Sequence, residues 1–472
     1  MTSTESPTVP DVEVTRHEEK GLLSLSNDIL LGVIQYCLAD DSESVEIPPN
    51  SHSQHLILCH ICHTLRSIIL ASPGLWTKFT LTTTRLGQHR DLYQEWLSRA
   101  EDQGGSYPIS MENREESTFS IAELNELVLP YSDRLLRVHL YLTYEALERL
   151  FNLVPPIPFP RLANFSVICS DFHQPSLLDV EPLFRGSPVK EFAIDLGPPV
   201  LVRGLGISWA RLKVLRLIAS RARFYFPISW IHAIFVACGA SLESCSISLE
   251  PTTDPDLPRI SLPSLRDLTI HFRDPGWKTQ AGFFGFLSLP SLISLELKSP
   301  DGLAFNEVCS ALKSFFHRSP NIQQLRFART VAPGSGFSST VNSTEVVNIL
   351  TLLPRLRVLE LPKGPHTNIM PVLEAILLKG VCTDLEALEM VVNNGIQAVR
   401  VIQVLWNESA AMAGEERSLS KITIIDPKSW WTSDGEPSLA EESEVAACRQ
   451  ILREMRDAGL VITLSNSLDT DS

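Results

Sequence analysis

The sequence predicts an α/β protein in which a short all-α module precedes a solenoid of repeated strand–helix units. Three observations predict this architecture. A short apolar pattern recurs along most of the 472 residues, helical spacing fills several gaps between its copies, and the segment near the N-terminus has helical spacing of its own. In such a solenoid parallel strands line one face and helices the other, because each unit buries its apolar sides only against its neighbours.

The N-terminal module is predicted over residues 21–81, after a polar tail at 1–20. Ser26 or Asn27 can cap a first helix whose apolar residues follow at helical spacing. After an acidic linker at 40–50, a second helix is predicted from Gln54 to Leu70. Both helices are apolar over too wide an arc to face only one another. The spare apolar surface either packs on a partner or docks against the first repeats.

The recurring pattern, Leu-x-x-Leu-x-Leu, runs through residues 133–465. In Leu-x-Leu the two apolar side chains share one face of a short strand, because side chains alternate. The clearest copies, each with a proline two residues ahead, begin at Leu265, Leu292, Ile322 and Leu356, and looser copies begin at Leu135, Leu162, Val189, Leu212, Leu242, Leu385 and Leu419. Their spacing is longer and less regular than the roughly 20–29 residues of leucine-rich repeats. We therefore expect a divergent leucine-rich-repeat solenoid with insertions.

Helices are predicted between copies at 305–318, at 343–353 and at 372–378, the last opened by a proline. A final amphipathic helix at 441–458 and a strand at 461–464 resemble a cap on the array. Residues 82–132 are expected to form a linker or capping region, and 466–472 a tail. The polar insertion at 426–442 contains Trp430 and Trp431, which either pack back on the core or anchor a partner.

Composition narrows the possible functions. The formal charge of −15 disfavours general binding to nucleic acid or to anionic membranes, because both would repel an acidic chain. No apolar run approaches the roughly 20 residues that cross a bilayer. The polar N-terminus lacks the apolar core of a signal peptide, and the nine cysteines do not form a secreted disulfide framework. We therefore expect a cytoplasmic or nuclear protein.

Metal or thiol chemistry is the main catalytic alternative, because six ligand-type residues cluster at His52, His55, Cys59, His60, Cys62 and His63. A single rigid helix cannot wrap four ligands around one ion, so this reading is disfavoured. Phosphate-loop, zinc-protease and nucleophile-elbow motifs are absent from the sequence. We expect no enzyme activity, no cofactor and no metal, although scattered His and Asp residues could still assemble in three dimensions.

A resemblance supplements these residue patterns. The segments Leu25–Leu30, Leu56–Arg66 and Ser72–Trp76, followed by Tyr93–Ala100 and Tyr107–Ile109, resemble the F-box-like domain of fungal proteins that continue into leucine-rich repeats. The order of these motifs is more specific than any one of them. Two positions depart from the family pattern, since Ser26 replaces a proline and Leu65 replaces a tryptophan.

The resemblance implies a function. F-box modules bind a Skp-type adaptor, which joins a cullin and a RING subunit in a ubiquitin ligase. By position, the residues that face or support the adaptor would be Leu25, Ile29, Leu30, Ile61, Cys62, Leu75 and Trp76. The solenoid would then hold a target protein near the charged enzyme, so that catalysis comes from proximity.

The substrate-binding face is predicted from period-two alternation, which points every second strand residue away from the core. Its candidates are Arg216, Asp267, Thr269, Glu296, Arg326, Glu360 and Glu389. Their mixed charges suit a protein or peptide better than a uniform anionic ligand, although each residue alone is more simply read as solvated. The alternative function is a non-ligase repeat scaffold with a degenerate F-box, which Ser26 and Leu65 motivate.

Overall fold

The computed structural model divides the chain into two compact units, Met1–Ser117 and Thr118–Ser472. The division falls inside the region 82–132 that the sequence marks as a linker. The structure describes residues 25–38, 45–47, 49, 53–81, 89–102, 105–106, 108–114, 118–152, 159–169, 176–179, 184, 186–196, 200–203, 209–218, 226–249, 257–272, 277–298, 305–328, 342–361, 369–392, 395–412, 418–425 and 439–465. The predictions for both tails, for His52 and for Trp430 and Trp431 lie outside these residues.

The helices of the first unit are α1 (Asn27–Cys37), α2 (Gln54–Ile61), α3 (His63–Leu70) and α4 (Arg90–Arg99), with a 3₁₀ turn, η2 (Pro73–Trp76). The prediction of one continuous helix from Gln54 to Leu70 is wrong. The backbone is extended at Cys62, with φ −158° and ψ 166°, and the Cys62 Sγ accepts a hydrogen bond from the backbone N–H of Leu65. Cys62 therefore caps α3 and ends α2, a role that apolar spacing alone does not reveal.

Short strands also lie within the segment that the sequence predicts as all-α. Strand β1 (Val45–Ile47) pairs in parallel with β2 (Lys78–Leu81), and β2 pairs with β5 (Ile109–Asn113). Strands β3 (Glu101–Asp102) and β4 (Gly105–Ser106) form an antiparallel pair. The all-α prediction is thus wrong for residues 45–47 and 78–81. The segments are too short to show a clear period in sequence, and pairing with a neighbour decides their conformation.

The second unit contains a large parallel sheet that is compatible with a solenoid-like fold. Its strands, in spatial order, are β6 (Leu135–Tyr141), β7 (Asn164–Cys169), β9 (Glu191–Leu196), β11 (Val214–Ile218), β12 (Ser244–Leu249), β14 (Asp267–Phe272), β16 (Ser294–Lys298), β17 (Gln324–Ala328), β18 (Val358–Glu360), β19 (Ala387–Val391), β20 (Lys421–Ile425) and β21 (Val461–Ser465). Each of the eleven predicted repeat copies, and the final predicted strand, leads into one of them. The strand order follows the chain order, as stacked repeats require.

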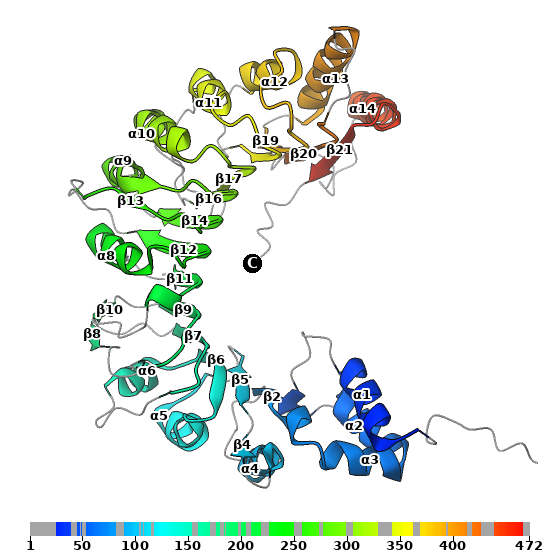
Figure 1. Cartoon of the computed structure of the whole chain (residues 1–472). Helices are drawn as coiled ribbons and strands as arrows, with labels where there is room; N and C mark the ends of the chain where they lie inside the picture. The colour runs from blue at the N-terminus through cyan, green and yellow to red at the C-terminus, as the bar shows by residue number, and fades with distance from the viewer. Residues whose placement is uncertain are drawn as a thin grey trace, which may run out of the picture. The chain divides into compact units, whose positions relative to one another are not determined.

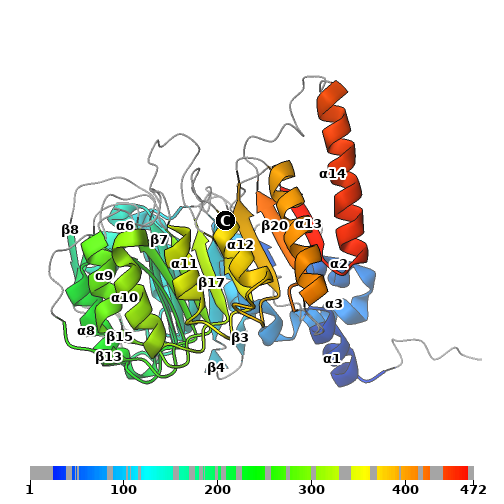
Figure 2. The same cartoon turned by 90° about the horizontal axis from the view of Figure 1, so that it is seen from above.

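Helices connect these strands and cover one side of the sheet. They are α5 (Ile121–Glu123), α6 (Tyr144–Phe151), α8 (Ile228–Cys238), α9 (Trp277–Phe286), α10 (Phe305–Arg318), α11 (Ser343–Leu350), α12 (Met370–Leu377), α13 (Gly395–Met412) and α14 (Leu439–Asp457). Within this unit the helices α8 to α14 follow one another along one side of the strands (Figure 1). A second view shows α10 to α13 in succession in front of the sheet (Figure 2). The other face of the strands carries no helix between β11 and β20 in the part of the chain that the structure describes.

Shorter elements complete the second unit. They are the helical turns η5 (Leu124–Val128), η6 (Leu129–Tyr131) and η7 (Trp209–Arg211) and two parallel strand pairs, β8 (Ser176–Asp179) with β10 (Val200–Arg203) and β13 (Ile260–Ser261) with β15 (Leu287–Ser288). They fill the connections between the main strands, where the spacing between repeat copies is irregular.

The repeated apolar residues form the core between strands and helices. In the copy that begins at Leu265, the side chains of Leu265, Leu268 and Ile270 are at most 1% exposed. The same three positions are buried in the copy that begins at Leu292. One unit cannot close this core, so stacking of neighbours is what removes the leucines from water.

Proline and glycine mark two helix ends that the sequence predicts. Pro371 stands in the first turn of α12, where its missing N–H costs nothing. Gly459 ends α14 with φ +88°, a conformation that a residue with a Cβ rarely adopts. Within the described residues, none of the helices combines the length and apolar character that crossing a bilayer would require.

Candidate interaction surfaces

The first candidate surface is an apolar face on the helices α1, α2 and α3. Among the predicted adaptor residues, Leu25, Ile29 and Ile61 are exposed, and Ile61 is exposed to 61%. Four further large apolar side chains on these helices are also exposed: Val33, Tyr36, Ile57 and Leu70. We call these seven residues the helical apolar face. The last four are absent from the predicted site. Helical spacing placed Val33 and Ile57 on apolar stripes, and only the fold shows that all four are exposed, Tyr36 to 85%.

The other four predicted adaptor residues have a supporting position. Leu30 and Trp76 are each 1% exposed, and Cys62 and Leu75 are partly buried. Leu30 packs inside the helical module, whereas Cys62 caps α3. These residues hold the exposed ones in place and offer little surface of their own. The structure thus separates the predicted set into three exposed residues and four that are buried or half-buried.

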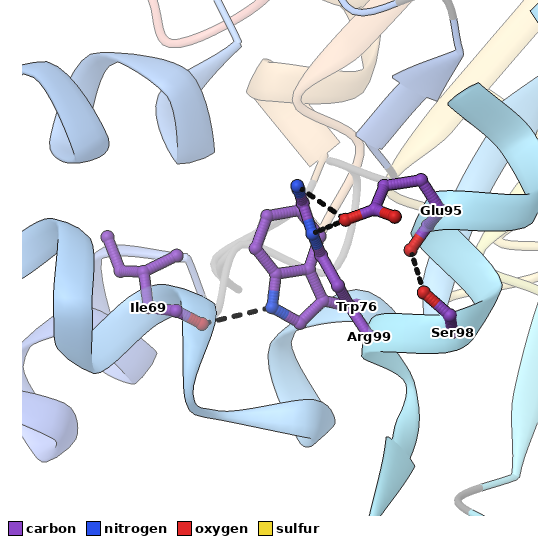
Figure 3. Close-up of polar contacts among 5 residues, drawn as sticks. All are labelled: Ile69, Trp76, Glu95, Ser98 and Arg99. Atoms are coloured by element: carbon purple, nitrogen blue, oxygen red, sulfur yellow. Dashed lines mark hydrogen bonds and ion pairs between the residues drawn. The ribbon is translucent and has the colours of Figure 1, made fainter. Parts of the chain in front are cut away.

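Trp76 anchors the turn η2 between α3 and α4 (Figure 3). Its indole Nε1 donates a hydrogen bond to the Ile69 carbonyl at 3.0 Å, and its ring packs edge-on against Trp96 at 4.5 Å. The guanidinium of Arg99 lies 4.8 Å above the Trp76 ring. Arg99 is oriented in turn by the Glu95 carboxylate, at 3.1 Å from its Nε and 3.0 Å from its Nη2. The cluster ties the end of α3 to α4 through aromatic packing and a cation–π contact.

His55 supports the same turn from α2. Its ring lies 6.1 Å from Trp76, and its Nε2 donates to the Leu75 carbonyl at 3.1 Å in the tautomer that carries a proton there. Burial lowers the pKa of His55 below its ordinary value, because the charged imidazolium would lose its hydration. Burial likewise raises the pKa of the Cys59 thiol, which disfavours the reactive thiolate.

The cluster of ligand-type residues that the sequence disfavours as a zinc site is not assembled by the described residues. The assumption that its ligands share one helix is wrong, because the break at Cys62 places His63 on α3 and Cys59 on α2. Nowhere in the described ranges do three or more His, Cys, Asp or Glu side chains form a group that could hold a metal ion. His52 lies outside those ranges.

The second candidate surface is the uncovered face of the sheet in the second unit. The parallel register places one residue from each strand in a single row across the sheet: Arg216, Ser246, Thr269, Glu296, Arg326, Glu360 and Glu389. We call this the recognition row. Each member lies between two buried apolar residues along the chain, so the row points away from the helices. Asp267, the remaining predicted residue, lies two positions before Thr269 and is exposed.

A polar network occupies the middle of this face. The Glu296 carboxylate accepts a hydrogen bond from the Thr269 hydroxyl at 3.2 Å and pairs with the Lys298 ammonium at 3.4 Å. On the next row, His271 Nε2 lies 3.5 Å from the Ser246 hydroxyl. Burial, with a smaller contribution from the Lys298 charge, lowers the pKa of His271 to about 4. His271 is therefore neutral at pH 7, and Lys298 largely compensates the charge of Glu296.

His271 was not among the predicted site residues. The sequence did contain a signal for it, because it stands two positions after Thr269 and so faces the same way.

The comparisons with known proteins add no information about these surfaces. Neither a protein-family model nor a curated protein sequence matches this chain.

Proposed function

We propose that this chain is the substrate-recognition adaptor of a Skp–cullin–F-box type ubiquitin ligase. In this proposal the helices of the first unit form an F-box-like module that binds the Skp-type adaptor. The strand–helix array forms a divergent leucine-rich-repeat solenoid that binds a target protein. The chain supplies no catalytic group and acts in the cytoplasm or nucleus, where such ligases assemble.

The observation that carries the proposal is the helical apolar face. Six of its side chains are exposed on α1, α2 and α3, and the seventh, Leu25, lies two residues before α1, whereas an ordinary surface scatters large apolar residues singly. Burying such a face against a partner is favourable by about 25 cal/mol for each Å² of apolar surface. Its members Leu25, Ile29 and Ile61 coincide with the positions that the resemblance assigns to adaptor contact.

The test is co-expression of the intact chain with a Skp-type adaptor, followed by purification through the chain. A deletion of residues 1–80 is a poor comparison, because it removes most of β2 and exposes the edge of β5. The better variant is Ile29→Glu/Ile61→Glu, which places two charges on the helical apolar face. We expect it to lower adaptor binding at least tenfold, since central interface residues contribute about 2 kcal/mol or more.

The matched control is Val236→Glu/Val404→Glu. These valines are 60% and 55% exposed on α8 and α13, so the same change is made at equally accessible apolar positions of the second unit. We expect this control to retain the adaptor. Loss of the adaptor from both variants, or from neither, would argue against the helical apolar face. If the unaltered chain does not bind the adaptor, the chain is better treated as a repeat scaffold, and Ser26 and Leu65 explain the loss.

A further inference from the structure

The recognition row changes sign along its length. From β11 to β17, the recognition row and the neighbouring row that holds His271 and Lys298 carry three cations, Arg216, Lys298 and Arg326, and one anion, Glu296. In contrast, β18 and β19 carry Glu360 and Glu389. The only other charged outward residue on β11 to β17 is Asp267. It stands at the start of β14, whereas Lys298 stands at the end of the neighbouring strand β16. In a chain with a formal charge of −15, the middle of this face is a local positive region.

Arg216 and Arg326 stand out because both are exposed and, among the described residues, neither makes a hydrogen bond or an ion pair. The neighbours of Arg216 in register are Ala193 and Ser246, which offer no charge. The neighbours of Arg326 in register are Glu296 and Glu360. Glu296 is already held by Thr269 and Lys298, and Glu360 also has an interaction of its own.

The distance between the two arginines is set by the sheet. Four steps, from β11 through β12, β14 and β16 to β17, separate their strands. At about 4.8 Å between neighbouring strands, their Cα atoms lie roughly 19 Å apart. An extended peptide advances about 3.3 Å for each residue, so side chains six residues apart span the same distance.

We propose that the recognition row binds an extended acidic peptide segment of the target protein, with two carboxylates about six residues apart that pair with Arg216 and Arg326. A guanidinium matches a carboxylate with two parallel hydrogen bonds, which gives such pairing geometric specificity. Between the two arginines the peptide crosses Ser246 and Thr269, whose small polar side chains leave room for its backbone. It also crosses Glu296, whose charge is paired with Lys298. Glu360 and Glu389 repel a further acidic residue beyond Arg326, so the acidic pair is confined to β11–β17. This inference rests on the part of the proposed function that assigns target recognition to the sheet face.

The test is selection of peptides by the full-length chain from a displayed library of random twelve-residue peptides at low salt. We expect enrichment of peptides with Asp or Glu at positions six apart, plus or minus one. Arg216→Gln/Arg326→Gln should weaken binding of a selected synthetic peptide at least tenfold, measured by fluorescence anisotropy. The matched control, Arg149→Gln/Arg453→Gln, removes two exposed arginines from α6 and α14 and should leave that affinity unchanged.

Three outcomes would overturn the inference: no enriched peptide, enrichment of basic sequences, or selected peptides that bind the Arg216→Gln/Arg326→Gln variant as tightly as the unaltered chain. Adaptor co-purification is measured on the same preparations. Loss of adaptor binding with intact peptide selection would contradict the ligase proposal alone. Intact adaptor binding without acidic selection would contradict the peptide inference alone.

Discussion

The helices of the first unit and the strand–helix array of the second treat apolar residues in opposite ways. Among the described residues, the structure exposes six large apolar side chains on α1 to α3 and a seventh, Leu25, just before α1. The described part of the second unit exposes only four: Ile121, Val236, Val404 and Val461. The array is many times longer, yet it hides its leucines more completely. Apolar content alone therefore does not distinguish a core from an exposed surface. The exposure of each apolar side chain in the folded chain does.

The difference has a structural cause. Each internal unit of the array has a neighbour before and after it. The apolar sides of its strand and helix are therefore covered by the strands and helices of those neighbours. The module of α1 to α3 has no such series. Three short helices enclose Leu30, Ile34 and Ile69 but cannot surround the other side of each helix. The array buries its apolar residues through its own repetition, whereas the first unit leaves the helical apolar face exposed among the described residues.

The largest expected effect concerns the stability that a buried aliphatic side chain contributes compared with an exposed one. Leu295 in β16 is 0% exposed and lies in register between Leu268 and Leu325. Leu295→Ala should lower the free energy of unfolding by about 3 kcal/mol, because it removes buried methyl groups and leaves a cavity. Ile61→Ala should change it by less than about 0.5 kcal/mol. Chemical denaturation followed by circular dichroism measures both, and equal effects would break the comparison.

A second prediction concerns the response of the array to acid. The pKa of His271 is about 4 in the folded chain, below the ordinary value of 6.5, so the unfolded chain binds its proton more readily. Stability from this residue is therefore complete above pH 6.5, falls as the pH drops toward 4, and levels off below that. The loss should be about 3 kcal/mol. His271→Gln should flatten the profile of unfolding midpoint against pH; an unchanged profile would show that His271 is not responsible.

A smaller expected effect concerns the contribution of Trp76 to the stability of the first unit. Trp76→Phe keeps the aromatic packing but loses the hydrogen bond to the Ile69 carbonyl and weakens the contact with Arg99. The expected loss is about 2 kcal/mol, the sum of a buried hydrogen bond and a cation–π contact. Trp230→Phe on α8, where the ring stacks on Phe226 at 5.3 Å, is the control and should lose less than about 1 kcal/mol. Thermal unfolding compares them, and equal losses would remove the special role of Trp76.

Much of the array could be predicted because its physical cause is local and repeated. Leu-x-Leu specifies a strand with one buried face, and a proline or glycine near each end limits the helix beside it. The copies at Leu265, Leu292, Ile322 and Leu356 accordingly lead into β14, β16, β17 and β18. The first unit was predicted less well. The break at Cys62 and the pairing of β1 with β2 depend on neighbours that spacing along the chain does not identify.

The candidate surfaces divide in the same way. By itself the sequence determined which residues face away from the core, since alternation along a strand needs no knowledge of the partner strand. Only the tertiary structure decided what those residues do for one another. Register brought Thr269 to Glu296, left Arg216 beside neutral neighbours, and placed His271 where burial lowers its pKa. The reason is that charge pairing and desolvation depend on distances across strands, and folding sets those distances between residues far apart in the chain.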